Sequence, residues 1–319
     1  MRQLDETGRL RHLLTLEGLP RETLVALLDR AQAMVDGVDD RSTLEGVAIC
    51  TLFFEPSTRT RLSFQRAAQR LGADVLAFDA STSSTTKGET ALDTLKNIEA
   101  MGVRGFVVRH AQDGAVAELA AAAAPGTALL NAGDGRSAHP TQGLLDMLTL
   151  RQAKGTDFSR LKVAIVGDVK HSRVARSDLH ALRTLGAGDG RAIDSHAIEI
   201  RVCGPQALLP EDGTLAGCTV THDLDAALGG VDAVLMLRLQ RERMAEGLVA
   251  SLEDYHRDYG LTPQRLRRAA PDAVVLHPGP MNRGVEITDE VADGPQSLIL
   301  RQVANGVAVR MAVLEALLG

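Results

Sequence analysis

The sequence lacks tryptophan, and only 3% of its 319 residues are aromatic, so its hydrophobic cores must be built from Leu, Val, Ile and Ala. Its three cysteines, Cys50, Cys203 and Cys218, form no Cys-x-x-Cys pair, which indicates reduced, structural thiols. No apolar run is long enough to span a bilayer, and the first residues do not have the pattern of a secretory signal. These absences predict a cytoplasmic protein without a membrane segment or a disulfide framework.

Motifs for metals, nucleic acids and dinucleotides are also missing. There is no His-Glu-x-x-His and no close His/Cys cluster, so we expect no metal site. The formal net charge of −6 argues against a general nucleic-acid binder, although not against a local basic pocket. The loop after the apolar run 162–168 lacks the second and third glycines of a dinucleotide fingerprint. A nicotinamide-dependent oxidoreductase is therefore a weak alternative.

The order of the remaining segments predicts an α/β protein. A chain of this length usually forms about two domains. Short β-prone apolar runs alternate with helix-forming stretches, as in parallel sheets covered by helices. A long helix over 301–318 closes the chain. The predicted strands lie at 47–54, 73–78, 105–110, 128–130, 162–168, 198–202, 218–221, 232–237 and 273–276.

The junction after the first strand is the most informative stretch. Pro56 ends the strand, and Ser57 or Thr58 can cap the helix that follows. Free N–H groups and the positive end of the helix dipole make such a junction an anion site. Ser57, Thr58 and Thr60 add hydroxyl donors, and Arg59 adds a planar fork that fits a phosphate. From composition alone, a capped helix with solvated arginines is an equal alternative.

Two further strand ends carry polar residues. Arg109 lies at the end of the predicted strand 105–110, and ligands of open α/β sheets bind beyond the carboxyl ends of strands. His139 and Gln142 lie in a glycine-rich turn, 131–142, that leads into a helix. A surface arginine and a structural histidine are the alternatives, and each would be favoured if the residue stood alone.

Two polar segments are predicted to be loops. The Ser/Thr-rich segment 81–88 carries Ser83 and Lys87, and Thr86 to Glu89 has capping-box spacing for the next helix. The polar stretch from Leu237 to Tyr259 follows a strand and is a candidate lid, for which a solvated charge run is the alternative.

Several of these segments resemble the signatures of the carbamoyltransferases, a family that contains aspartate and ornithine enzymes. Residues 57–61 resemble Ser-x-Arg-Thr-Arg, residues 87–90 Lys-Gly-Glu-Thr, and residues 132–142 Ala-Gly-Asp-Gly…His-Pro-Thr-Gln. The segments 167–173 and 238–240 follow in matching order, so the resemblance covers nearly the entire chain.

The resemblance implies that the first half of the chain binds carbamoyl phosphate. The loop at 57–60 would hold the phosphate, His139 would donate to the carbonyl oxygen, and Gln142 would contact the amino group. Donors placed where negative charge develops lower the barrier, which makes Arg59, Thr60, Arg109 and His139 the candidate catalytic residues. The binding residues implied in this half are Ser57, Thr58, Arg59, Thr60, Arg109, His139 and Gln142.

The resemblance likewise implies an amino-acid site in the second half. Arg173 would bind the α-carboxylate, and Lys87 would reach in from the neighbouring subunit. Carbonyl groups beside Pro280, which has no N–H, can accept from the substrate amino group. Some family members have leucine at Gly279, but its backbone carbonyl can still act. The residues implied for amino-acid binding are Ser83, Lys87, Arg173, Arg238, Gln240, Gly279 and Pro280.

Two features favour the aspartate branch of the family. Ornithine enzymes carry His-Cys-Leu-Pro near the C-terminus, whereas this chain has His-Pro-Gly-Pro at 277–280. Arg238 and Gln240 suit a substrate with two carboxylates, and a cationic ornithine side chain would be repelled by Arg173 and Lys87. The implied reaction is carbamoyl transfer from carbamoyl phosphate to L-aspartate, an early step of de novo pyrimidine biosynthesis.

The family resemblance also implies an architecture and an assembly. It implies two doubly wound parallel-sheet domains with the active site between them and the C-terminal helix packed on the first domain. Residues 1–141 plus 302–319 would bind carbamoyl phosphate, and residues 142–301 would bind aspartate. The assembly would be a homotrimer with sites shared between subunits, and no cofactor is implied. A larger assembly with a regulatory chain or a dihydroorotase-like subunit is left open.

A non-catalytic homologue is the remaining alternative. Such a scaffolding or binding protein should lack at least one of the residues that the chemistry needs. Arg59, Lys87, Arg109 and His139 are all present, so the sequence favours an enzyme.

Overall fold

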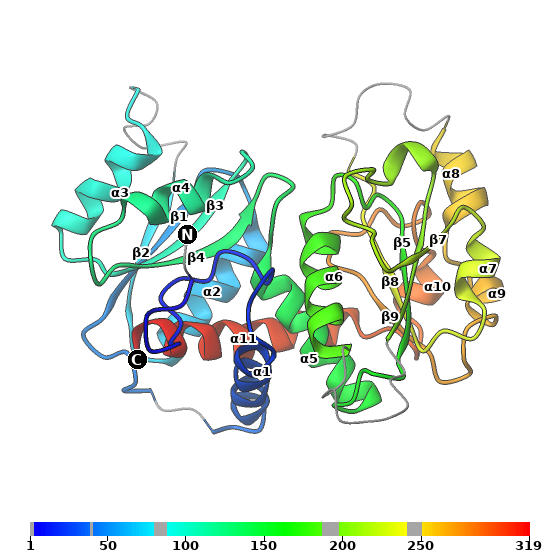
Figure 1. The fold of residues 1–319 in the computed structure, drawn as a ribbon, viewed down its shortest axis with the longest axis horizontal. Helices are drawn as coiled ribbons and strands as arrows, with labels where there is room; N and C mark the ends of the chain where they lie inside the picture. Colours follow the sequence, from blue (N-terminus) through cyan, green and yellow to red (C-terminus); the bar gives the residue numbers. More distant parts are fainter. Residues whose placement is uncertain (1–2, 39–40, 80–87, 187–197, 241–250) are drawn as a thin grey trace. The chain divides into compact units, whose positions relative to one another are not determined.

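The structure, a computed structural model, describes residues 3–38, 41–79, 88–186, 198–240 and 251–319 (Figure 1). The chain forms two compact units, Met1–Leu148 with Ala304–Gly319 and Thr149–Val303. Both divisions fall inside helices, α5 (Pro140–Lys154) and α11 (Ile299–Leu318). The sequence placed the domain boundaries at 141/142 and 301/302, close to the start of each of these helices.

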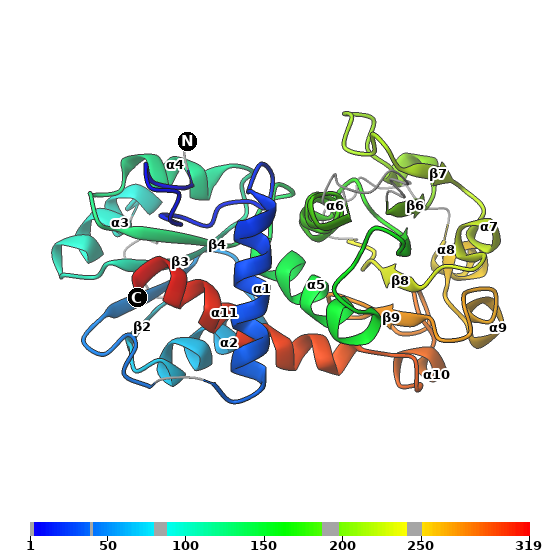
Figure 2. The same ribbon diagram turned by 60° about the horizontal axis from the view of Figure 1, so that its bottom comes forward.

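The first unit contains a parallel four-stranded sheet in the order β2-β1-β3-β4. Helix α2 (Thr58–Arg70) connects β1 to β2, and in Figure 2 it lies with α11 on the face opposite α3 (Ala91–Ala100) and α4 (Ala115–Ala122). The chain therefore changes direction between the adjacent strands β1 and β3, as in a doubly wound fold. The strands are β1 (Ala48–Phe53), β2 (Asp74–Asp79), β3 (Gly105–His110) and β4 (Ala128–Asp134).

The C-terminal helix packs on the first unit, as predicted. Met311 and Leu314 on α11 are buried. The Arg30 guanidinium on α1 (Arg21–Val35) forms an ion pair with Glu315, with 2.6 Å between Nε and Oε2. The last segment of the chain is thus part of the first core.

Three local predictions in the first unit are wrong. Ser57 is at the predicted N-cap position of α2, but the predicted side-chain cap is not formed, because its hydroxyl donates to Thr60 Oγ1 at 2.9 Å. Helix α3 is capped at Thr90, which exchanges bonds with Asp93, and not at the predicted Thr86, which lies outside the described residues. Strand β4 continues to Asp134 because it pairs with β3 through the segment that was predicted as a turn.

The second unit contains a parallel five-stranded sheet in the order β7-β6-β5-β8-β9. Direction changes here between β5 and β8. The strands are β5 (Lys162–Val166), β6 (Glu199–Cys203), β7 (Thr219–Thr221), β8 (Ala233–Met236) and β9 (Val274–Leu276). The helices are α6 (Arg173–Gly186), the 3-10 helix η3 (Gln206–Leu208), α7 (Leu224–Leu228), α8 (Leu252–Tyr259), α9 (Pro263–Leu266) and α10 (Asp289–Ala292).

The predicted polar loop from Leu237 to Tyr259 ends in a helix instead. Ser251 caps α8 by accepting from the Asp254 N–H at 2.9 Å. The side chain of Tyr255 on α8 is buried, with 2% exposure. This buried side of the helix attaches an otherwise polar segment to the core. The part of this stretch at 241–250 lies outside the described residues.

Both cores are mainly aliphatic, as the scarcity of aromatics predicts. The second-unit core is built from residues such as Val166, Val234 and Leu228. Cys50 and Cys203 are free thiols, and burial raises the pKa of each to about 12, which is typical of structural cysteines. In the described part of the chain, no helix is long and apolar enough to cross a membrane.

Candidate active site

The candidate phosphate loop and Arg109 lie at the switch point of the first sheet. Strands β1 and β3 are neighbours, Phe53 is in register with Arg109, and the Phe54 N–H donates to the Arg109 carbonyl at 2.9 Å. The loop after β1 therefore emerges beside the end of β3. Ligands of doubly wound folds bind at such a point.

Arg109 is a buried, oriented arginine and not the surface residue of the alternative interpretation. It is 8% exposed. Its Nη1 donates to the Ala132 carbonyl at 3.0 Å, and its Nη2 donates to Glu55 Oε1 at 3.1 Å. Glu55, two residues after the end of β1, was not singled out from the sequence. The two bonds fix the guanidinium plane and tie the ends of β1, β3 and β4 together.

The N-terminus of α2 presents hydroxyls and a cation. Thr60 is buried, Ser57 is half-buried, and Thr58 and Arg59 are exposed. Because Ser57 bonds to the Thr60 hydroxyl, its side chain does not occupy the backbone donors of the first helical turn. This helix end therefore retains the features of an anion site.

His139 and Gln142 are placed by the start of α5. Both are buried, with 5% and 7% exposure. The Gln142 Nε2 donates to Asp146 Oδ1 at 3.0 Å, one helical turn further on. Because a carboxylate only accepts, this bond assigns the amide nitrogen to Asp146 and leaves the carbonyl oxygen as the group suited to a substrate amino group.

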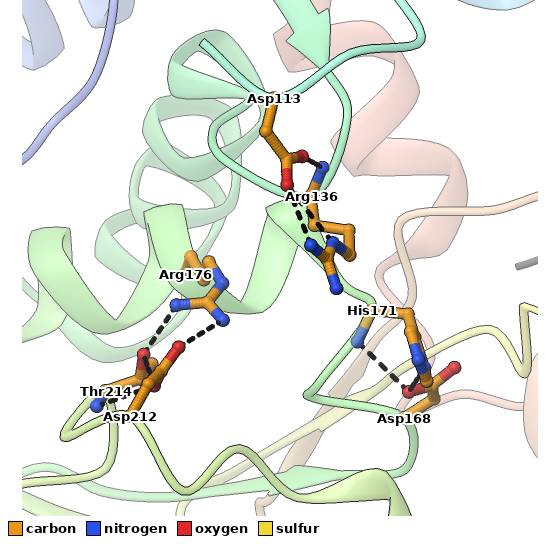
Figure 3. A network of polar contacts seen from close by, with 7 residues as sticks. All are labelled: Asp113, Arg136, Asp168, His171, Arg176, Asp212 and Thr214. Carbon is orange, nitrogen blue, oxygen red and sulfur yellow. Dashed lines mark hydrogen bonds and ion pairs between the residues drawn. The ribbon is translucent and has the colours of Figure 1, made fainter. Parts of the chain in front are cut away.

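Side-chain hydrogen bonds hold the end of β4 and the segment that leads into α5. Asn131 Nδ2 donates to Asp134 Oδ1 at 2.8 Å, and the Gly133 N–H donates to Asn131 Oδ1 at 2.8 Å. On the exposed side, Arg136 Nη2 donates to Asp113 Oδ2 at 3.0 Å (Figure 3). The glycine-rich segment is therefore fixed before His139.

Charges buried behind the phosphate loop were missed by the sequence analysis. Asp146 is 2% exposed, and Arg310 on α11 is 4% exposed. Arg310 lies over the ring of Phe64 on α2, 4.7 Å from the ring centroid to Cζ. The sequence did contain one signal for this cluster, because Arg310 is a charged residue on the apolar side of the C-terminal helix.

The electrostatics link this cluster to Arg59. Burial and the positive charge of Arg59 lower the pKa of Arg310, and the charge of Asp146 opposes them, so that the pKa is about 9. The Arg59 side chain reaches the surface, but the protein around its guanidinium lowers its pKa by desolvation, against the opposing charge of Asp146. The negative charge of Asp146 thus favours the charged form of both guanidinium groups.

The second unit places Arg173 and Arg238 at its own switch point. Strand β5 is followed by Gly167, where a Cβ would lie 3.0 Å from the Tyr255 hydroxyl and 3.1 Å from the Leu237 carbonyl, so glycine is required. Arg173 begins α6 and is 6% exposed. The Leu237 N–H donates to the Val166 carbonyl at 2.8 Å, which places the residues after β8 beside this loop.

Asp168 organises the segment around it. It is fully buried and accepts from the His171 N–H at 3.2 Å and from the His171 ring Nδ1 at 2.8 Å (Figure 3). Burial raises the pKa of Asp168, while His171 and the backbone N–H of Gln240 lower it. The carboxylate therefore holds His171 in the loop after β5.

The segment after β8 alternates in burial. Leu237 and Leu239 are each 1% exposed, while Arg238 and Gln240 are half-buried. In an extended chain this alternation sends Arg238 and Gln240 to the same side, away from the core. The spacing Arg-x-Gln is therefore suited to gripping one ligand.

A proline turn follows β9. His277 is 2% exposed, Gly279 and Pro280 are more exposed, and the peptide bond between Gly279 and Pro280 is cis. Gly279 has φ +58°, in the left-handed region that favours glycine, which accounts for glycine at a position where leucine would be strained. Its N–H donates to His277 Nδ1 at 2.8 Å.

Two predicted site residues, Ser83 and Lys87, lie outside the described residues. Among those that the structure describes, no group of three or more His, Cys, Asp or Glu side chains could hold a metal ion. The described candidate residues for anion binding lie in the first unit, and those predicted to bind an amino acid lie in the second.

Comparison with known proteins identifies the same family over both units. The model of the aspartate/ornithine carbamoyltransferase carbamoyl-P binding domain matches residues 11–152, and that of the Asp/Orn binding domain matches residues 159–317. The chain is 77% identical to the aspartate carbamoyltransferase catalytic subunit of Xanthomonas axonopodis pv. citri (strain 306) and 75% identical to that of Stenotrophomonas maltophilia (strain R551-3), over 99% of each chain.

Solved structures of both branches are similar to this chain. Aspartate transcarbamoylase from Trypanosoma cruzi, in complex with carbamoyl phosphate and aspartate, has a TM-score of 0.83, 32% identity and 97% coverage of both chains. Ornithine carbamoyltransferase from Thermus thermophilus also has a TM-score of 0.83, with 29% identity and coverage of 97% of this chain and 99% of that one. The fold is therefore common to the two branches.

Proposed function

Because the chain belongs to the aspartate/ornithine carbamoyltransferase family, we propose that it transfers the carbamoyl group of carbamoyl phosphate to the amino group of L-aspartate. The products are N-carbamoyl-L-aspartate and phosphate, in an early step of de novo pyrimidine biosynthesis. The observation that carries the proposal is the full-length identity to proteins named as aspartate carbamoyltransferase catalytic subunits. Fold similarity does not separate the aspartate from the ornithine branch, since both give equal TM-scores.

In the proposed mechanism, Arg59, Thr60, Arg109 and His139 act as the catalytic residues. The aspartate nitrogen attacks the carbonyl carbon, a tetrahedral oxyanion forms, and the bond to the phosphate oxygen breaks. The nitrogen loses one proton, for which the departing phosphate is our proposed acceptor. Donors fixed beforehand at the developing charge lower the barrier, and the bonds from Arg109 to Glu55 and Ala132 support such a role.

We assign carbamoyl phosphate to the first unit and aspartate to the second. Ser57, Thr58 and Gln142 complete the proposed carbamoyl phosphate site. The high positive charge expected around Arg173 and Arg238 suits the two carboxylates of aspartate and disfavours ornithine. The residues proposed for aspartate are Ser83, Lys87, Arg173, Arg238, Gln240, Gly279 and Pro280. The functional domains would be 1–141 plus 302–319 and 142–301.

The direct test is a carbamoyl-transfer assay with aspartate and ornithine side by side, on protein whose mass in solution has been measured. We expect transfer to aspartate and little transfer to ornithine. Transfer to ornithine alone would overturn the choice of branch. Absence of transfer to either amino acid by folded protein would favour the non-catalytic alternative.

We further propose a cytoplasmic homotrimer whose active sites are shared between subunits. The motivating feature is the Ser/Thr-rich sequence at 81–88, which is too polar for a core and carries Lys87. Arg59 and Lys87 of one site would then come from different chains.

Subunit exchange tests the shared site. Arg59→Ala and Lys87→Ala should each be inactive alone, but mixed trimers should contain some sites with neither change. Activity should therefore reappear on mixing. Inactive hybrid trimers, confirmed by mass and compared with wild-type subunits that survive the same exchange, would contradict the proposal.

A further inference from the structure

The ring of His277 uses both of its nitrogens inside the second unit. The Gly279 N–H donates to Nδ1 at 2.8 Å, so Nδ1 must be the unprotonated nitrogen. Nε2 lies 3.2 Å from Glu286 Oε1, which also accepts the Asn282 N–H at 2.6 Å. Because that oxygen acts as an acceptor, Nε2 carries the proton. The hydrogen bonds thus define one tautomer of the ring.

The ring and the Glu286 carboxylate hold the proline turn at both ends. Pro278 and Pro280 have no N–H, so the five residues 278–282 contain three backbone donors. Two of these three, on Gly279 and Asn282, are taken by His277 and Glu286, which also bond to each other. The conformation of the turn therefore depends on buried side chains.

This frame is anchored in the core. The side chains of His277 and Glu286 are both 0% exposed. The His277 N–H donates to Oε1 of Gln302, itself 2% exposed, at 2.9 Å. Water does not reach the ring, so loss of Nδ1 would leave the Gly279 N–H without its acceptor.

The same turn is connected to the Arg238-x-Gln240 segment. Asn282 Nδ2 donates to the Leu239 carbonyl at 3.4 Å. Leu239 packs against Leu208 and Tyr255 and is itself buried. The two backbone segments proposed to contact aspartate are therefore linked through the frame made by His277, Glu286 and Asn282.

We propose that His277, in the tautomer protonated at Nε2, is a positioning residue that holds the carbonyl groups of Gly279 and Pro280 where they accept from the attacking amino group. The inference rests on the proposed function, because it assigns the turn to the amino group of aspartate. His277 does not touch the substrate in this scheme. It acts through the backbone of the turn, in support of the orientation that rapid attack requires.

A matched pair of variants tests the inference. In His277→Asn the amide oxygen lies the same number of bonds from Cα as Nδ1 and can accept from Gly279, whereas His277→Leu removes the acceptor. Both variants lose the contact with Glu286, so both should lose similar thermal stability. We expect kcat/KM for aspartate to fall about tenfold or more in His277→Leu and to stay within about threefold of wild type in His277→Asn.

Carbamoyl phosphate binding is the internal control. Its dissociation constant, measured by calorimetry without aspartate, should be unchanged in both variants because its proposed residues lie in the first unit. Equal loss of activity in two folded variants would overturn the positioning role, as would full activity in His277→Leu. Wild-type protein that fails to carbamoylate aspartate would refute the proposed function instead.

A second measurement needs no variant. In wild-type protein labelled with ¹⁵N-histidine and ¹⁵N-glycine, a nitrogen–nitrogen coupling across the hydrogen bond should connect one glycine amide to one histidine Nδ1. That Nδ1 should have the chemical shift of an unprotonated ring nitrogen at neutral pH. A protonated Nδ1 on His277 would overturn the inference even if neither variant folds.

Discussion

The two units hold their candidate binding residues in place by different means. In the first unit, the candidate binding groups are side chains that interact with other charged side chains. Arg109 donates to Glu55, and the charge of Asp146 acts on Arg59 and Arg310. In the second unit, buried polar side chains accept hydrogen bonds from the backbone of the segments that carry the candidate binding residues. Asp168 accepts from the His171 N–H, and His277 accepts from the Gly279 N–H. A phosphate calls for fixed positive charge, whereas an amino group calls for correctly placed acceptors.

The largest effect is expected from a substitution that breaks the buried charge cluster of the first unit, formed by Asp146 and Arg310. Asp146→Asn should lower the free energy of unfolding by about 3–5 kcal/mol, because Arg310 would lose its compensating charge inside the protein. Urea denaturation measures the change, and Asp74→Asn, at an exposed carboxylate of β2, is the control. A loss below about 1 kcal/mol, typical of ordinary surface changes, would contradict this function of Asp146.

Arg59→Ala should leave the fold intact, because the side chain reaches the surface at the start of α2. Turnover should fall by at least about 10², the cost of one charge-stabilising donor. Steady-state kinetics and circular dichroism measure the two quantities. Arg66→Ala, an exposed arginine on the same helix, should have near-normal turnover. Near-normal activity of folded Arg59→Ala would refute the proposed phosphate loop.

His139→Ala should mainly lower kcat, with a smaller change in KM, since its bond to the carbonyl oxygen strengthens in the transition state. Only the acceptor gains charge in this bond, whereas Arg59 is itself a cation, so the loss should be about tenfold and smaller than for Arg59. Initial rates over a range of both substrates separate the constants. A large KM effect with kcat unchanged would make His139 a binding residue only.

The smallest effect concerns an exposed pair in the second unit. Asp212 bonds to Thr214 and Arg176 (Figure 3), and these contacts lower its pKa from 3.8 to about 2. A lowered carboxyl pKa stabilises the folded state above pH 3.8, and this contribution is lost as the pH falls through 2. Asp212→Asn should therefore cost less than about 1 kcal/mol at pH 7.

Thermal unfolding at decreasing pH measures this dependence. The difference between Asp212→Asn and wild type should shrink as the pH falls from 4 toward 2, and turnover at pH 7 should not change. Glu211→Gln removes a neighbouring exposed charge without breaking the contact to Arg176. A pH-independent difference would show that Asp212 contributes through packing instead of charge.

Much of the fold follows from local sequence patterns. Apolar runs predicted the nine strands of the two sheets, and Arg109 was correctly placed at the end of its strand. Errors arose where short-range signals competed. Thr86 and Thr90 can both begin a capping box, and only the start of α3 at Ala91 decides between them. The segment after Ser251 was predicted to be a loop because most of its residues are polar, whereas in the structure it is a helix whose Tyr255 side chain is buried.

The sequence by itself determined the order of strands and helices, the position of candidate ligands at strand ends and the family resemblance, because these depend on periodicity and motif spacing along the chain. Only the tertiary structure decided which polar groups are buried together. Asp146 and Arg310 are far apart in sequence, yet the charge of Asp146 raises the pKa of Arg310. The tautomer of His277 likewise depends on Glu286 and on the fold of the turn at Gly279. Burial of a polar group is favourable only with its partners, and those partners are brought together by folding.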